Sequence, residues 1–317
     1  MSKQSYFNIV LFLGYAMLAY IALFMVETSR SGYTNSSIAV SLSVVVASLG
    51  LGVAAQLIFD WHCTRSFRLV LKYALVTIGL MLGVLVLFAW ETIICLVLGL
   101  PIIGVALIFG LLVTRYVLGR MNGKSMMCLP FLALPLMAPA IDTSALFPMQ
   151  SYAVTTQLEM RGTPAQLRVL AQNVPLITND ERPWTITHNL LRAPRPLQAN
   201  LRDGVRYAQW EHGVAFEEVL IDDGDPNTIA WQFRFPDPDL LDPIDYHVSP
   251  TGPEVFMDQG QYRFEQISDD RTRVSLTTTY RLNTIMNGYL ALWGEVLLDD
   301  FHMAVLHVIA QRAEATL

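Results

Sequence analysis

Apolar residues fill most of the first 140 positions in segments much longer than the buried face of an ordinary helix. Four of these segments contain no more than one charged residue each: Tyr6–Val26, Ile38–Phe59, Val70–Phe88 and Thr92–Thr114. A helix needs about 20 apolar residues to cross the hydrocarbon core of a bilayer. Because helices of soluble proteins seldom stay uncharged over such lengths, the pattern predicts four membrane-spanning helices.

A fifth apolar segment, Ser125–Ile141, is shorter and contains three prolines. Proline removes a backbone donor and kinks a helix, although membrane helices tolerate it better than soluble helices do. We expect this segment either to span the membrane or to form a re-entrant or interfacial stretch. Residues 1–141 are therefore predicted to be a transmembrane helical domain with four to five spans.

Basic residues occur in alternate connections of this predicted bundle, before the first span and after the second and fourth. Since basic loops remain in the cytoplasm, the N-terminus is predicted to be cytoplasmic. If the fifth segment spans the membrane, the rest of the chain lies outside the cytoplasm, and otherwise it is cytoplasmic. The basic residues are Lys3, Arg65, Arg68, Lys72, Arg115, Arg120 and Lys124.

From residue 142 onward the pattern changes to short alternating segments, which are typical of strands. Thr163, Pro164 and Gln166 predict the capped start of a helix that ends near Gln172. Ile285–Ala315 has apolar residues at helical spacing and is predicted to form one long helix. The predicted strands are Ser151–Met160, Leu197–Leu201, Val205–Glu211, Val214–Ile221, Ile229–Phe235, Gln261–Ile267 and Thr272–Leu282.

The predicted fold class is therefore α+β, with a transmembrane bundle at residues 1–141 and a soluble domain at residues 142–317. An antiparallel sheet that curves around one long C-terminal helix leaves a cavity between the two. Concave apolar cavities are the usual sites for small ligands.

Charge is divided unevenly between these two parts. Residues 1–141 contain eight basic and three acidic residues, a net charge of +5, whereas the remainder contains 13 and 24, a net charge of −11. Nucleic-acid binding needs a basic face that replaces phosphate counterions. The acidic soluble domain is therefore not expected to bind nucleic acid.

Several short motifs follow the predicted elements in a recognisable order. They are Gly204-Val-Arg206-Tyr207, Phe216-Glu217-Glu218, Asp270-Arg271-Thr-Arg273-Val, Thr277-Thr-Thr-Tyr280-Arg281 and Tyr289-Leu-Ala-Leu-Trp293. This order resembles the START-like helix-grip superfamily (SRPBCC), which includes polyketide cyclases and lipid-transfer proteins. It is most similar to a bacterial group that joins such a domain to an N-terminal membrane bundle. The chain departs from the pattern at Asp299-Asp300, where a more basic helix is expected.

The resemblance implies a pocket for a hydrophobic molecule and a location in the bacterial inner (plasma) membrane. It identifies neither a ligand nor a reaction, because one fold hosts carriers, enzymes and sensors. The predicted ligand-binding residues lie on the strands and the long helix that flank the cavity. They are Arg206, Glu218, Tyr280, Trp293 and His302.

Alternation along a strand places neighbouring side chains on opposite faces of a sheet. We therefore expect one member of each pair, Arg206 or Tyr207 and Tyr280 or Arg281, to face the pocket, with tyrosine as the inward residue. The predicted partners are a lipid or other hydrophobic small molecule and the membrane. No metal or other cofactor is expected.

The leading functional hypothesis is a membrane-tethered domain that binds or transfers a lipid. The alternative is a cyclase- or hydrolase-like enzyme that uses His302 with a carboxylate such as Glu218 for acid–base chemistry. A third hypothesis is a regulatory module that signals to the bundle. For His302 the structural interpretation is a histidine that is hydrogen-bonded between helix and sheet.

Overall fold

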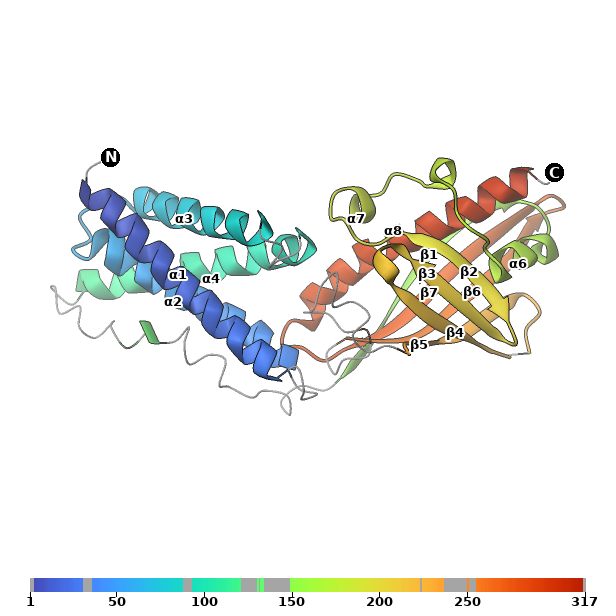
Figure 1. The fold of residues 1–317 in the computed structure, drawn as a ribbon, viewed down its shortest axis with the longest axis horizontal. Helices are drawn as coiled ribbons and strands as arrows, with labels where there is room; N and C mark the ends of the chain where they lie inside the picture. The colour runs from blue at the N-terminus through green and yellow to red at the C-terminus, as the bar shows by residue number, and fades with distance from the viewer. Residues whose placement is uncertain are drawn as a thin grey trace. The chain divides into compact units, whose positions relative to one another are not determined.

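A computed structural model of the chain describes residues 3–30, 36–87, 93–120, 130, 132–133, 149–222, 224–236, 250 and 255–315. The chain divides into two compact units, Met1–Pro148 and Met149–Leu317 (Figure 1). Each unit is described by itself below. The domain boundary predicted between residues 141 and 142 lies outside the described residues.

Helices make up the described part of the N-terminal unit. Three helical stretches, Lys3–Leu23, Phe67–Leu87 and Ile93–Arg120, are long and apolar enough to cross a membrane, which fits membrane association. The helices are α1 (Lys3–Arg30), α2 (Ser36–Asp60), α3 (Phe67–Leu87) and α4 (Ile93–Arg120).

The prediction of four to five spans is not met by the described residues. Helix α2 is not among these three stretches; its described apolar part is Val44–Asp60, and its final turns carry the buried polar residues Gln56 and Asp60. The fifth predicted span, Ser125–Ile141, lies almost entirely outside the described residues. Three candidate spans therefore replace the four to five expected.

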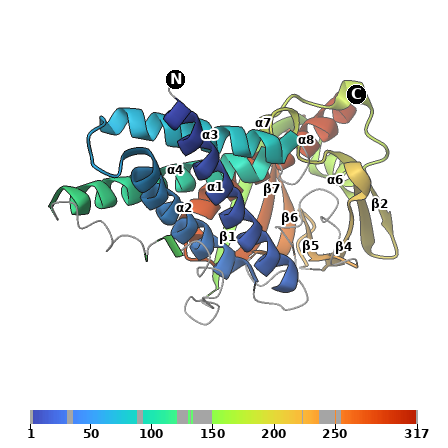
Figure 2. The same cartoon turned by 60° about the vertical axis from the view of Figure 1, so that its left-hand side comes forward.

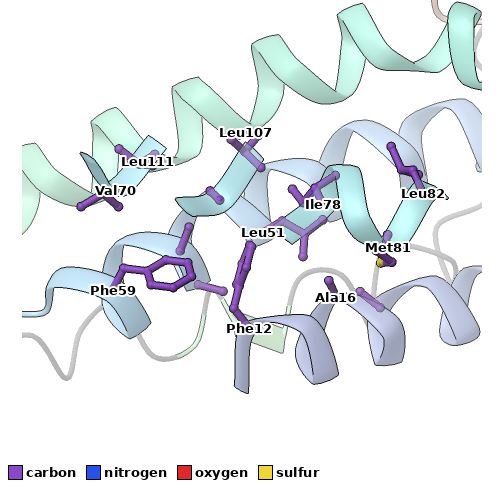
Figure 3. Packing of buried hydrophobic residues seen from close by; sticks show 14 of the residues in the cluster. Phe12, Ala16, Leu51, Phe59, Val70, Ile78, Met81, Leu82, Leu107 and Leu111 are labelled. Atoms are coloured by element: carbon purple, nitrogen blue, oxygen red, sulfur yellow. The ribbon is translucent and has the colours of Figure 1, made fainter. Parts of the chain in front are cut away.

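Apolar side chains from all four helices form one core (Figure 3). Phe12 of α1 meets Phe59 of α2 edge to face, with ring centroids 5.3 Å apart. Helices α2 and α4 approach so closely that a Cβ atom on Gly110 would overlap the carbonyl oxygen of Leu49. Small residues allow this backbone contact between membrane helices, where packing rather than the hydrophobic effect drives association.

Polar contacts fix one end of the helical unit. The Asp60 carboxylate accepts hydrogen bonds from the backbone N–H of Thr64 (2.7 Å) and of Arg65 (3.1 Å), and it lies 3.4 Å from the Arg115 guanidinium. The side chain of Asn8 donates to the carbonyl of Ile58 at 2.7 Å, which places the start of α1 beside the end of α2. Arg65 and Arg115, which lie far apart in the sequence, thus meet at one end of the unit.

The C-terminal unit is an antiparallel sheet of seven strands in the order β1-β7-β6-β5-β4-β3-β2. The sheet curls around the long helix α8, which confirms the predicted α+β class (Figures 1 and 2). The strands are β1 (Gln150–Arg161), β2 (Pro196–Arg202), β3 (Val205–Trp210), β4 (Ala215–Ile221), β5 (Thr228–Arg234), β6 (Val255–Ser268) and β7 (Arg271–Leu282). The helices are α6 (Pro164–Gln172), η3 (Asn179–Glu181), α7 (Ile186–Asn189), η4 (Glu211–Gly213) and α8 (Asn287–Ala315).

Local sequence explains most of these boundaries. Thr163 and Gln166 form the predicted capping box at the start of α6. Strand β6 begins at Val255, earlier than the predicted Gln261, because the apolar residues Val255–Met257 also pair with β7, ahead of a register shift between Met257 and Gln259. The apolar core lies between the sheet and α8, where Leu306 and Ile309 are fully buried.

Candidate functional site

A row of aromatic rings runs from α8 across the sheet to β6. Neighbouring ring centroids along the row lie 5.1 to 6.1 Å apart. The inner rings are buried, whereas the outer four are only half-buried. Such rings offer a large apolar surface on which a hydrophobic molecule can pack. In order, the row consists of Phe301, Trp210, Phe216, Phe233, Trp231 and Tyr262.

A buried ion pair lies against the inner end of this aromatic row. Arg206 on β3 and Glu218 on β4 are directly opposite in the strand register, and their NH1 and Oε2 atoms are 3.1 Å apart. The guanidinium carbon lies 5.3 Å from the ring centroid of Trp231 and 5.7 Å from that of Tyr262. Cations prefer such positions over aromatic faces.

This cluster retains unused hydrogen-bonding capacity. Nε and NH1 of Arg206, Oε2 of Glu218 and Nε1 of Trp231 are buried and have no hydrogen-bond partner among the described residues. The 3.1 Å ion pair lacks the alignment of a hydrogen bond. Buried polar atoms are nearly always bonded to protein or to ordered water. The inner end of the row therefore holds buried polar atoms that no described residue satisfies.

Burial dominates the electrostatics of the same cluster. It raises the pKa of the Glu218 carboxyl, and the nearby Arg206 guanidinium acts in the opposite direction. Burial also raises the pKa of the Tyr262 hydroxyl. Burial therefore favours a neutral Tyr262, and it favours a Glu218 that is either neutral or paired with Arg206.

The prediction that Tyr207 faces the pocket is wrong. Arg206 points inward and is 3% exposed, whereas Tyr207 is 41% exposed. The arginine turns inward because its cross-strand neighbour Glu218 supplies an opposite charge inside the sheet. At the second pair the prediction is correct, since Tyr280 is buried with its ring 5.9 Å from that of Tyr152.

His302 on α8 is buried between two threonine hydroxyls. The Thr156 hydroxyl donates to the Asp299 carboxylate at 2.6 Å, so its oxygen accepts from Nδ1 of His302 at 3.0 Å. Nδ1 therefore carries the ring proton, and Nε2 accepts from the Thr278 hydroxyl at 2.7 Å. Burial lowers the pKa of His302 to about 4. His302 is therefore a neutral side chain that bonds α8 to β1 and β7.

The structure does not join His302 to Glu218. Both ring nitrogens of His302 are occupied by threonines, and the described ion-pair partner of Glu218 is Arg206. The unexpected acidic pair on α8 also has structural partners, since Asp299 accepts from Thr156 and Asp300 accepts from the backbone N–H of Thr187 at 2.7 Å. These contacts explain why acidic residues occur where a basic helix was expected.

Trp293, the remaining predicted ligand-binding residue, is half-buried on α8. Its indole makes no contact with another aromatic ring among the described residues, so ring packing does not connect it to the aromatic row. It lies eight residues before Phe301, which places the two side chains about 80° apart around α8.

Protonation of His302 is expected to destabilise the C-terminal domain at low pH. Because the folded pKa of about 4 lies below the usual 6.5, stability is complete above pH 6.5 and falls as the pH drops toward 4. A tenfold change in proton affinity corresponds to about 1.4 kcal/mol, so the loss is roughly 3 kcal/mol. Urea unfolding of residues 149–317 at several pH values measures it. His302→Gln should be less stable at pH 7 but should lose less between pH 6.5 and 4, and parallel curves would contradict the assignment.

Within the described ranges a small cavity lies beside the aromatic row. Its volume is about 10 Å³, which is close to the space that one water molecule occupies. Sequence analysis did not single out this region. The cavity is lined by Ile177, Arg182, Pro183, His188, Arg195, Pro196, Ala304 and Val308. Among the described residues, no three His, Cys, Asp or Glu side chains converge as metal ligands would.

No protein-family model matches the chain, and no curated protein matches it in sequence. Among solved structures, the Zhui aromatase/cyclase from Streptomyces sp. R1128 is 14% identical, with a TM-score of 0.32 over 52% of this chain and 94% of that one. Norcoclaurine synthase from Thalictrum flavum, in complex with dopamine and hydroxybenzaldehyde, is 10% identical, with a TM-score of 0.33 over 53% and 90%. The protein XoxI from Bacillus cereus is 12% identical, with a TM-score of 0.31 over 52% and 96%. Similarity at this level does not establish a function.

Proposed function

We propose that the C-terminal domain binds a lipid or another hydrophobic small molecule along the aromatic row. The observation that carries the proposal is the composition of the row itself. Its outer rings are half-buried, and its inner end meets the Arg206–Glu218 pair, whose polar atoms are incompletely bonded. An apolar wall with a few buried polar groups is the usual form of a small-molecule site.

The apolar N-terminal helices support a membrane-tethered form of this function. A tether raises the effective concentration of the domain beside a membrane without any new contact. In the proposed arrangement the chain spans a bacterial inner membrane several times, with a cytoplasmic N-terminus and an extracytoplasmic START-like domain. The meeting of Arg65 and Arg115 at one end of the helical unit favours a single orientation.

The alternative of a cyclase- or hydrolase-like enzyme has less support. General acid–base catalysis needs a group whose pKa lies near the working pH and whose proton can reach the substrate. His302 has a pKa lowered to about 4 and both of its nitrogens are bonded to threonines. We therefore favour binding or transfer over catalysis.

Native mass spectrometry of residues 149–317 produced in bacteria tests the proposed function. We expect a stoichiometric extra mass that matches a lipid or another hydrophobic molecule. Phe216→Ala should reduce the retained fraction about tenfold, because a truncated aromatic side chain at a binding site often costs more than 1 kcal/mol. The matched control is Tyr207→Ala, which removes an exposed ring from the neighbouring strand. Equal retention in both variants would contradict the assigned site.

A further inference from the structure

The segment between η3 and β2 turns apolar side chains outward and polar side chains inward. Thr185, Thr187 and His188 are at most 6% exposed. The apolar residues between and beside them form what we call the 184–190 patch: Trp184 (65% exposed), Ile186 (48%) and Leu190 (57%). This pattern is the inverse of the usual one, since removal of apolar surface from water is the dominant favourable term in folding.

The inward side chains hold the 184–190 patch in place. The Thr185 hydroxyl accepts from the backbone N–H of His188 at 3.2 Å and caps α7. The backbone N–H of Thr187 donates to Asp300 on α8 at 2.7 Å, and the His188 ring stacks on Phe301 at 5.3 Å. Helix α7 therefore lies against α8 with a defined orientation (Figure 1). The patch is a fixed surface and not a loop that could turn its apolar residues inward.

Positive charge borders the patch although the domain as a whole is acidic. Arg192 is exposed, Arg195 is half-buried, and neither forms an ion pair with any other residue that the structure describes. Two acidic side chains near these arginines pair with other arginines, Glu211 with Arg182 at 2.9 Å and Glu181 with Arg312 at 2.6 Å, whereas Asp300 accepts from the backbone N–H of Thr187 at 2.7 Å and is half-buried beneath the patch. The surface thus combines an indole, two aliphatic side chains and two arginines that form no ion pair with a described residue.

We infer that the 184–190 patch inserts into the interfacial region of a lipid bilayer that contains anionic lipids. Tryptophan is enriched at the level of the headgroups, and leucine and isoleucine gain by entering the acyl boundary. Arginine near the surface is attracted by anionic headgroups. The apolar helices of the same chain keep a bilayer within reach of the domain. This contact does not depend on the proposed ligand site, because it needs no bound molecule.

Fluorescence quenching of the full chain in nanodiscs tests the inference. The nanodiscs contain phosphatidylcholine and about one-third phosphatidylglycerol, with or without bromine on the acyl chains. The chain has six tryptophans, so the contribution of Trp184 is taken as the difference between wild type and Trp184→Phe. We expect brominated lipid to reduce this contribution about twofold or more, because a ring at the acyl boundary is within reach of the quencher. Leu190→Asp should abolish the effect.

The matched control is Val169→Asp on α6, which alters a side chain that is 66% exposed but lies outside the patch. It should leave the quenching of Trp184 unchanged. An equal Trp184 contribution in brominated and plain lipid would overturn the inference, and this comparison stands even if Leu190→Asp unfolds. The other possible occupant of the patch is a second copy of the chain. In that case Trp184 would remain unquenched, and the chain would form a dimer that Leu190→Asp dissociates. Ligand retention is not measured, so failure here leaves the proposed function unaffected.

Discussion

Replacing Glu218 with leucine is expected to destabilise the C-terminal domain by about 3–5 kcal/mol, the usual cost of leaving one partner of a buried ion pair uncompensated. Arg206 would retain its charge in a position that is 3% exposed, and no other carboxylate is described as pairing with it. Its stacking on Trp231 and Tyr262 offsets only part of this cost. Urea unfolding of residues 149–317, compared with the wild type, measures the loss.

The double variant Arg206→Met/Glu218→Leu provides the control for this prediction. With both charges removed, apolar side chains of similar size fill the same space, and such replacements are often neutral or stabilising. We expect the double variant to recover most of the stability lost in Glu218→Leu. If the stability lost in the double variant equalled the sum of the losses in the single variants Arg206→Met and Glu218→Leu, the two side chains would not be coupled. Recovered stability without recovered ligand retention would assign the pair to binding rather than to folding.

The second large effect is expected from Gly110→Leu in α4. A side chain at this position would overlap the backbone of Leu49, so α2 and α4 could no longer approach as closely. The expected loss is at least about 3 kcal/mol, the upper end of the usual cost of overpacking. Thermal unfolding of the full chain in detergent, followed with a thiol-reactive dye that reports on Cys63 and the other cysteines, should show a lower midpoint.

Gly104→Leu is the matched control on the same helix. Beyond the backbone of α4 itself, a Cβ atom at Gly104 meets no described atom within 4 Å, so this substitution is expected to leave the midpoint nearly unchanged. Its effect on helix propensity is the same as at Gly110, which isolates the contact with α2 as the cause. Equal midpoints for the two variants would show that the close approach of α2 and α4 contributes little to stability.

The element order of the C-terminal domain could be predicted because its signals are local. Alternation identified the strands, and the capping box of Thr163 and Gln166 marked the start of α6. Asp203 and Gly204 have φ angles of 49° and 78°, and an Asp-Gly pair between two strands is a local signal for such a tight turn. The apolar helices of the N-terminal unit were equally visible, since hydropathy depends only on composition.

The site was less predictable because its partners come from different strands. Alternation could not decide whether Arg206 or Tyr207 faces inward, since that choice depends on Glu218 across the strand pair. The aromatic row was missed, because its rings come from α8 and from strands that are distant in the sequence. Hydrophobicity alone would predict a buried Trp184, and its 65% exposure became visible only from the packing of α7.

The pairing of β1 with β7 also sets the order in which the domain can form. The first strand of the domain finds its partner only in the last strand, and α8, which fills the sheet, follows β7. During synthesis the sheet therefore remains open until the ribosome has released β7 and α8. Contacts between residues this distant in sequence close slowly, so the N-terminal helices can form while the domain behind them is still unfolded. Factors that protect nascent chains should then act on this protein late in its synthesis, at a stage when its aromatic strands are exposed.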